Sequence, residues 1–450
     1  MSGCVPTRVV SVLIAAMAGT MPEAVEAAEA SNAGDDAPVE DRAEGDEVQG
    51  YPTPKRIIGT PLDSQTDLRA SFPQPGAIFR EAELTPVAKA KNWLYDEIGL
   101  QLGVSYQMLF QQASDASPDS DETALGGWFL FESRWELIDR GGDFMGTFVA
   151  TIDARHAIGD LGNPGLFKLD LGSLWLTDAV FLQWDPYPID LFWEQWLGKD
   201  FLVVRAGFQS PGASLHDFYR FKDPRVSFSG SPFALGVEAI PAGPPGPAVS
   251  FELWPIEDSE LYLIGSISDI NSFPGRFDWS GLDFGEFFYA VELGYNFRRG
   301  KGDFDHVHLM AFYADERTTP APIPLLESEA GAGFKLRGTK QFGPAVMSGS
   351  YTFNDAPGGG FGVATARHSA SASFAWMRPL NVSGEVALGL AWADPFNDDL
   401  RDQFGTELYW RMLIIPSLWL TPGVQTIFQP SFNPEVDAIV VGQLKFRLTL

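Results

Sequence analysis

Apolar and polar residues alternate with period two through most of the chain after Gly99. From Leu100 to Phe110 every second residue is apolar, and the residues between them are mostly polar or small. The final segment, from Ala438 to Leu450, alternates in the same way. Successive side chains of a strand point to opposite faces of its sheet, so this pattern predicts strands with one apolar face.

About sixteen such segments can be counted. They start near Leu100, Trp128, Phe144, Ile189, Phe201, Ala248, Glu260, Phe287, Val307, Ala330, Ala345, Arg367, Asn381, Phe404, Ser417 and Val436. Their connections alternate between short turns and longer polar loops, such as 154–188 and 210–247. An even number of strands of about ten residues with this loop alternation is typical of a transmembrane β-barrel. A soluble β-sandwich or propeller also alternates, and it is the competing architecture.

In a membrane barrel the outward side chains meet lipid and the inward ones meet a polar lumen. This register predicts that Leu102, Phe148, Leu293, Leu388 and Phe446 face lipid. It places charged residues of both signs inside, and the candidate pore-lining and substrate-binding residues are Arg205, Glu194, Glu132, Arg134, Glu292, Arg337, Glu385, Glu407 and Arg411. Arg205 and Glu194 are the strongest candidates, because they flank one short turn on neighbouring strands.

The amino end has a different composition. Residues 1–30 have the pattern of an export signal, with Arg8, the apolar run Val9–Ala18 and a small-x-small cleavage site at Ala28–Ala30. Residues 31–82 are acidic and poor in aromatic residues, which predicts a disordered tail. Residues 83–99 predict an amphipathic helix on the periplasmic side, and residues 100–450 the barrel.

The chain carries 59 acidic residues against 31 Lys and Arg, a formal net charge of −28. This acidity argues against a nucleic-acid partner, which needs a basic surface. The one cysteine, Cys4, lies in the signal segment, so a disulfide framework is not expected. The catalytic motifs of hydrolases, zinc proteases and nucleotide-binding loops are missing from the sequence, and His306-x-His308 offers two ligands without an evident third. We therefore expect neither an enzyme nor a cofactor or metal site.

Several short stretches of the sequence are similar to the motifs of one known family. They are Asn92–Leu94 before Gly99, Trp193–Leu197 followed by Val204–Gly207, Gly285–Phe287 with Glu292–Tyr295, Gly405–Tyr409, and Leu420–Gln425 with Gln429–Pro430. In these stretches the chain resembles the carbohydrate-selective porins of the OprB type. The resemblance covers about Asn92 to the C-terminus. It implies an all-β, sixteen-stranded antiparallel barrel in the outer membrane of a Gram-negative bacterium, through which mono- and oligosaccharides diffuse passively. It also implies outer-membrane lipid, periplasmic chaperones and the barrel-insertion machinery as partners, and leaves monomer or homotrimer open.

The segment 210–247 lies where general porins fold a loop into the lumen. It mixes rings and charges suited to a constriction, namely His216, Asp217, Phe218, Tyr219, Arg220 and Phe221. An external cap that never enters the pore is the other reading. For the whole protein, two alternatives to the sugar porin stay open: a general cation-preferring porin, and a secreted all-β protein that binds or degrades polysaccharide.

Overall fold

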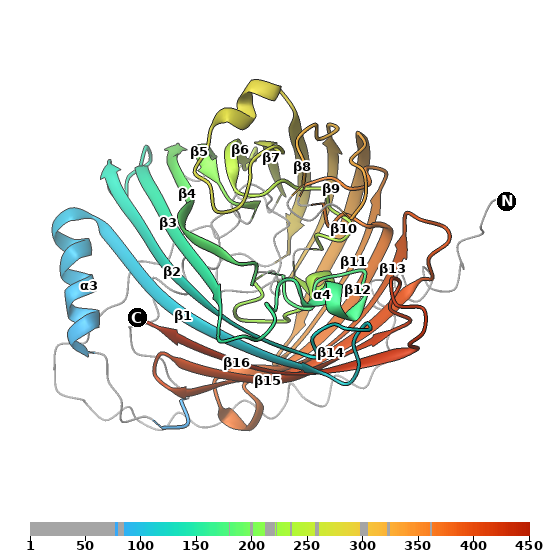
Figure 1. The fold of residues 1–450 in the computed structure, drawn as a ribbon. Coiled ribbons are helices and arrows are strands. Elements are labelled where there is room, and N and C mark those ends of the chain that lie inside the picture. The colour runs from blue at the N-terminus through green and yellow to red at the C-terminus, as the bar shows by residue number, and fades with distance from the viewer. Residues whose placement is uncertain are drawn as a thin grey trace, which may run out of the picture. The chain divides into compact units, whose positions relative to one another are not determined.

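The computed structural model describes residues 77–79, 85–179, 181–198, 201–211, 221, 223–234, 236–256, 261–297, 305–321, 325–360 and 362–450. Within these residues, sixteen antiparallel strands form a closed barrel (Figure 1). The expectations for the signal, for all of the acidic tail except residues 77–79, and for residues 216–220 lie outside the described residues.

The strands follow one another in chain order around the barrel. Their bounds are β1 Leu100–Ala113, β2 Thr123–Ile138, β3 Gly146–Ala157, β4 Trp184–Leu197, β5 Leu202–Gln209, β6 Gly246–Leu253, β7 Leu261–Asp269, β8 Phe287–Asn296, β9 His306–Ala314, β10 Gly331–Phe342, β11 Ala345–Asn354, β12 Ala366–Met377, β13 Gly384–Pro395, β14 Gln403–Ile415, β15 Leu418–Phe428 and β16 Ala438–Thr449. The helices are α3 Thr85–Ile98, α4 Phe167–Leu171 and the short 3-10 turns η2 Ser231–Phe233, η3 Ser280–Phe284 and η4 Pro379–Asn381.

The first and last strands close the ring. β1 pairs with β16 in a register that runs from Ser105 opposite Thr449 to Ala113 opposite Val441. Closure leaves no sheet edge with unpaired backbone groups, which is the condition for a sheet to stand in lipid. The predicted fold class is therefore confirmed.

Some strands begin at other residues than the alternation suggests. β2 and β4 begin at Thr123 and Trp184, earlier than the predicted Trp128 and Ile189, whereas β13 begins late. The segment expected from Asn381 starts at Gly384, because Arg378, Leu380 and Asn381 have positive φ angles and the chain forms η4 at Pro379–Asn381, with Arg378 as its N-cap. A left-handed backbone cannot continue an extended strand. The connection between β12 and β13 accordingly extends from Arg378 to Ser383.

The two faces of the wall differ as the alternation predicts. In β16, Lys445 and Arg447 are buried inside the barrel, whereas Phe446 and Leu448 are 41% and 44% exposed on the outer face. Leu293 and Leu388 are also exposed on the outer face. An apolar outer band around charged inner side chains is the arrangement of a membrane barrel.

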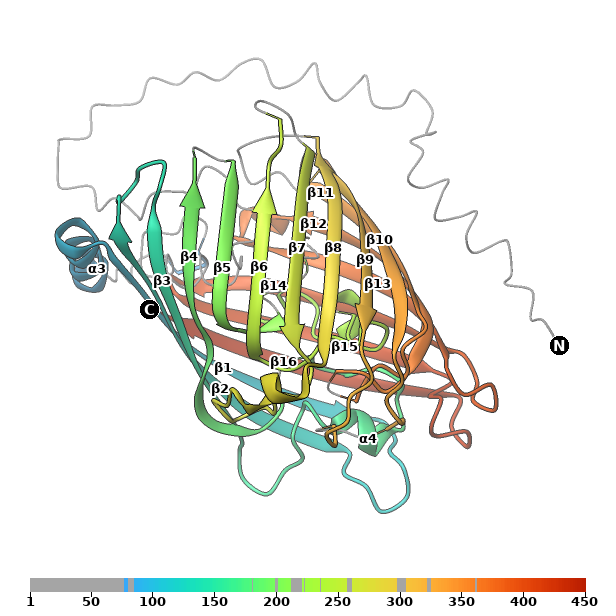
Figure 2. The same cartoon turned by 90° about the horizontal axis from the view of Figure 1, so that it is seen from above.

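Helix α3 lies at the start of β1, at the end of the barrel with the short turns, whereas α4 lies towards the end with the long connections (Figure 2). Arg140, in the β2–β3 turn, donates to the carbonyls of Tyr95 and Asp96 near the helix C-terminus, and Trp135 Nε1 donates to the Ile98 carbonyl. These bonds satisfy carbonyl groups that a helix end leaves without intrahelical partners. In the described part of the chain, none of the helices is both long enough and apolar enough to cross a membrane.

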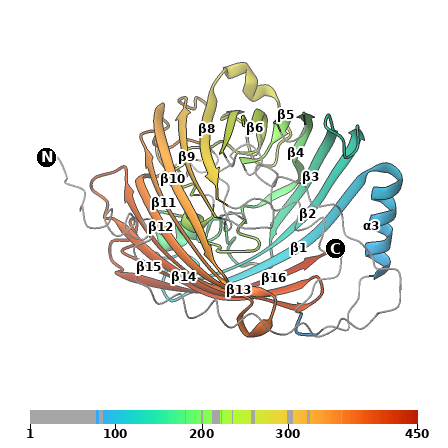
Figure 3. The same ribbon diagram turned by 180° about the vertical axis from the view of Figure 1, so that it is seen from behind.

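Two long connections fold into the barrel rather than away from it. One joins β3 to β4 and carries α4. The other joins β5 to β6, and its described part is 210–211, 221, 223–234 and 236–245 (Figure 3). They bond to each other, since Ala179 N donates to the Ser229 carbonyl and Ser231 N donates to the Leu176 carbonyl. The sequence pattern predicted a polar loop over 154–188. The structure differs in two ways: β3 continues to Ala157 and β4 begins at Trp184, and Leu174, Trp175 and Leu176 in between are buried.

Candidate functional site in the barrel lumen

Most of the charged residues singled out from the sequence lie buried on the inner wall. Arg134, Glu132, Glu194, Arg205, Glu292, Arg337, Glu385 and Glu407 are each at most 8% exposed, and Arg411 is half-buried. The structure brings three of them into one network and gives the others separate contacts.

The network is a chain of ion pairs across neighbouring strands. Arg134 Nη2 on β2 lies 2.5 Å from Glu194 Oε1 on β4, and Arg205 Nε on β5 lies 2.7 Å from Glu194 Oε2. Arg205 Nη1 then lies 2.5 Å from Glu252 Oε1 on β6. Glu194 and Arg205 are direct partners in the β4–β5 register, which is why the short turn between them brings them together. We name these four residues the ion-pair chain.

The pairing explains how four charges can be buried on one wall. Glu194 is fully buried and Arg205 is 1% exposed. An ionised group removed from water is costly unless an opposite charge and hydrogen bonds compensate it. Glu194 and Arg205, the two central residues of the ion-pair chain, each contact two residues of opposite charge. These contacts offset the cost of burying their charges.

Glu407 serves the inserted β5–β6 connection. Its Oε1 accepts the backbone N–H of Ser229 at 2.8 Å, and its Oε2 accepts that of Gly230 at 2.9 Å. Gln443 Nε2 donates to the same Oε1. On the neighbouring side, Lys445 Nζ donates to the carbonyls of Pro224 and Ser227.

Glu132 holds the same connection at another point. Its carboxylate lies 3.6 Å from Arg225 Nη1, and Arg225 also pairs with Asp223 at 3.1 Å. Burial alone would raise the pKa of Asp223, but the guanidinium groups of Arg225 and Arg447 lower it below its ordinary value. Asp223 therefore stays charged at neutral pH.

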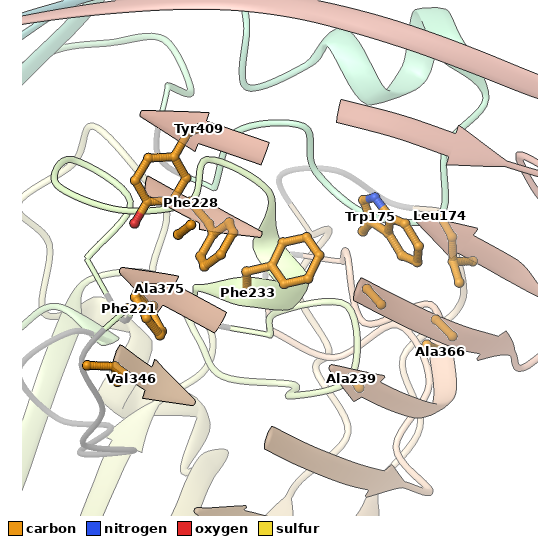
Figure 4. Packing of buried hydrophobic residues seen from close by; sticks show 13 residues of the cluster. Leu174, Trp175, Phe221, Phe228, Phe233, Ala239, Val346, Ala366, Ala375 and Tyr409 are labelled. Atoms are coloured by element: carbon orange, nitrogen blue, oxygen red, sulfur yellow. The ribbon is translucent and has the colours of Figure 1, made fainter. Parts of the chain in front are cut away.

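Aromatic rings of the inserted connection pack on a patch of small residues in the wall (Figure 4). Phe228 stacks edge-on against Phe221 and Tyr409, with ring centroids 5.3 and 4.9 Å apart. Phe233 lies over Gly389, where an added Cβ would come within 2.6 Å of the ring. The inward alternation of Ala and Gly along β13 was the sequence signal for this contact, because a wall that receives an inserted ring needs small side chains.

The other predicted residues lie apart from the ion-pair chain. Glu292 Oε1 accepts the Tyr262 hydroxyl at 2.8 Å, and Arg337 sits opposite His308 in the β9–β10 register. Glu385 accepts the hydroxyl of Tyr409. The Arg411 guanidinium lies 4.6 Å from the ring centre of Trp419.

A second charged and aromatic cluster was missed by the sequence reading. The Arg155 guanidinium lies between the rings of Trp128 and Trp184, at 4.4 and 3.8 Å from their centres. It also pairs with Asp153, which accepts from Trp184 Nε1. The alternating segment at Phe144 contained Asp153 and Arg155 on one face, and this was the available signal.

In the β3–β4 connection, the pKa of Lys168 in α4 is shifted far from its ordinary value. Its ammonium is buried and donates to the Leu174 carbonyl at 2.9 Å. Burial disfavours the charged form and lowers the pKa of Lys168 to about 7, with Glu238 opposing the effect. Across the described residues, His, Cys, Asp and Glu side chains do not form a group of three that could hold a metal ion.

Comparison with known proteins supports the fold. No protein-family model matches the chain, and no curated protein does. The high-pH structure of Pseudomonas putida OprB superposes with a TM-score of 0.63 at 13% identity, over 80% of this chain and 96% of that one. The low-pH structure of the same protein has a TM-score of 0.49 at 10% sequence identity, over 81% of this chain and 96% of that one. A triple mutant of Rhodopseudomonas blastica porin has a TM-score of 0.46 at 11% sequence identity, over 78% of this chain and 100% of that one. The similarity to the high-pH OprB structure establishes a porin-like barrel.

Proposed function

We propose that this protein is an outer-membrane porin that lets mono- and oligosaccharides diffuse passively. The observation that carries the proposal is the ion-pair chain on the lumenal wall of a closed barrel with an apolar outer face. A channel for neutral, hydroxyl-rich solutes needs hydrogen-bonding groups of both signs, without a strong excess of either. The likeness to OprB in fold supports the same interpretation.

The charge balance of the wall favours sugars over cations. Among the described residues, the buried charged side chains of the strands comprise nine acids and seven bases: Glu132, Asp153, Asp190, Glu194, Glu252, Asp269, Glu292, Glu385 and Glu407 against Arg134, Arg155, Arg205, Lys335, Arg337, Lys445 and Arg447. The whole chain, by contrast, carries 59 acids against 31 bases. The acidic excess therefore belongs mainly to other parts of the chain. The nearly balanced charges of the wall argue against a strongly cation-selective lumen.

A sugar path also needs donors and rings that a solute can reach. A sugar brings hydroxyl acceptors for side-chain donors and apolar ring faces for stacking on aromatic side chains. Arg411 is half-buried on the inner wall, and its guanidinium lies 4.6 Å from the ring centre of Trp419. The predicted loop residues His216, Asp217, Phe218, Tyr219 and Arg220 complete the proposed constriction, together with Phe221.

Planar-bilayer conductance with titrated mono- and disaccharides tests this function. Neutral sugars should block the ion current of the wild-type protein in a concentration-dependent way. Arg205→Ala should weaken that block and shift ion preference towards cations, because a fixed positive charge leaves the wall. Ion current without block by any neutral sugar, unchanged in Arg205→Ala, would leave a general porin as the better description.

The proposal includes a topology. Export by the amino-terminal signal, periplasmic chaperones and the barrel-insertion machinery would deliver the chain to the outer membrane, with α3 and the short turns on the periplasmic side. Lys89 is exposed on α3. A cysteine placed there should resist labelling by a membrane-impermeant thiol reagent in intact cells and react after the outer membrane is opened. A homotrimer remains the assembly to test.

A further inference from the structure

The part of the β5–β6 connection from Pro224 to Gly230 is fixed to the wall through its backbone. Two of its carbonyls, those of Pro224 and Ser227, accept from Lys445 Nζ. Two of its amides, those of Ser229 and Gly230, donate to Glu407. We name residues 224–230 the clamped segment.

The signs of the two wall charges match the backbone groups that they meet. Carbonyl oxygens carry partial negative charge and meet an ammonium, whereas amide hydrogens carry partial positive charge and meet a carboxylate. Buried backbone groups outside regular structure need such partners, because leaving them unpaired costs as much as a lost hydrogen bond. Ala387, Gly389 and Ala391, which form the nearby wall, have no side-chain donor or acceptor to supply.

Both wall residues are held in place themselves. Glu407 is fully buried and Lys445 is 2% exposed. They stand on β14 and β16, and Gln425 of β15 between them donates to Gln443, which in turn donates to Glu407. We call the contacts of Glu407 and Lys445 with the clamped segment the clamp. The clamp is thus part of a connected network across three strands.

We propose that Glu407 and Lys445 are positioning residues that set the width of the constriction by holding the clamped segment flat against the wall. The proposal rests on the channel function proposed above. Behind the segment is the closed sheet of β13 to β16, so a released segment can move only inwards. Loss of either charge should therefore narrow the lumen intermittently.

Single-channel recording of the full-length protein tests this. Glu407→Gln keeps the volume of the side chain but turns one acceptor into a donor that faces amide N–H groups. Lys445→Met removes the donor to two carbonyls. Both variants should show downward current flickers and a lower mean conductance than wild type, and liposome swelling should slow more for disaccharides than for monosaccharides.

Two further variants separate positioning from general damage. Lys445→Arg keeps the cation and its donors, so it should restore steady wild-type current, which a loss of packing alone would not predict. Asp437→Asn removes an acid whose side chain is fully exposed at the β15–β16 loop, and it should leave the recording unchanged. Only variants that run as compact barrels on unheated gels are scored. If Glu407→Gln does not fold, Gly230→Ala serves instead, because its Cβ would lie 3.1 Å from Glu407 Oε2 and push the segment inwards.

The outcomes distinguish the two proposals. Folded Glu407→Gln and Lys445→Met proteins with wild-type conductance and wild-type sugar permeation would overturn the clamp. Flickering variants of a protein that no neutral sugar blocks would uphold the clamp and overturn the sugar function. A wild-type protein that conducts no ions would overturn both.

Discussion

Glu194 is the residue at which the stability of the lumenal wall can be tested most directly. It is fully buried, and its carboxylate accepts from Arg134, Arg205 and Trp196 Nε1, the last at 3.2 Å. In Glu194→Ala the Arg134 guanidinium loses its carboxylate ion-pair partner, whereas Arg205 keeps Glu252.

The loss of unfolding free energy in Glu194→Ala can be worked out from these contacts. A hydrogen bond to a charged group contributes about 1.5–3 kcal/mol, and breaking a buried pair from one side costs about 3–5 kcal/mol. Arg205 retains one partner and water can enter the space left by the shorter side chain, so we expect a loss of about 3–5 kcal/mol rather than the sum of three bonds. Glu194→Gln, which keeps the volume and one acceptor, should lose less than Glu194→Ala.

Urea unfolding of the barrel in lipid vesicles, followed by tryptophan fluorescence and by gel mobility without heating, measures this loss. The matched control is Asp398→Ala, which removes a pair with Arg367 at 3.5 Å in which the Asp398 side chain is 89% exposed. Such a pair contributes about 0–1 kcal/mol. If Glu194→Ala destabilises the barrel no more than Asp398→Ala does, the ion-pair chain is not a buried network and the reasoning fails. A double-mutant cycle with Arg134→Ala should give a coupling energy that the control pair does not.

Three further perturbations probe other parts of the molecule. Leu293→Arg places a charge on the outer face, where Leu293 is 51% exposed, and should cost about 2–4 kcal/mol in the same unfolding assay; an unchanged midpoint would contradict the outer-face register. Gly389→Ala should cost about 1–3 kcal/mol, because its Cβ would lie 2.6 Å from the Phe233 ring, and Phe233→Leu should recover part of the loss; full stability of Gly389→Ala alone would refute the contact. Lys168 has a pKa of about 7 in the folded barrel, whereas its ordinary pKa is 10.5. Between these pH values the unfolded chain binds more protons than the folded one. The free energy of unfolding should therefore rise as the pH increases from about 7 towards 10. Lys168→Met should be the more stable protein below pH 7 and should lack this rise, and equal pH slopes in both proteins would contradict the buried ammonium.

The sequence already contained the barrel, because alternation is a local property. A period of two over some ten residues identifies a strand and both of its faces, and alternating connection lengths order the strands around a ring. This is why Leu293, Leu388 and Phe446 could be placed on the outer face and Lys445 and Arg447 on the inner one. The pairing of Glu194 with Arg205 was also within reach, since one short turn sets the register between their strands.

Contacts across the lumen could not be read in this way, because they join residues far apart in the chain. The bonds from Glu407 to Ser229 and Gly230 span 178 and 177 positions, and no periodicity links a wall residue to a loop that folds back onto it. For the same reason the β3–β4 connection was predicted only as a polar loop, although its run Leu174–Leu176 is apolar and is buried in the barrel. Where a loop goes depends on which wall offers space and partners, and small residues such as Gly389 acquire that meaning only once the barrel has closed around them. Local patterning therefore determined the strands, their faces and their order, while the closed tertiary structure decided which charges hold the lumen's inserted segments and which pair with one another.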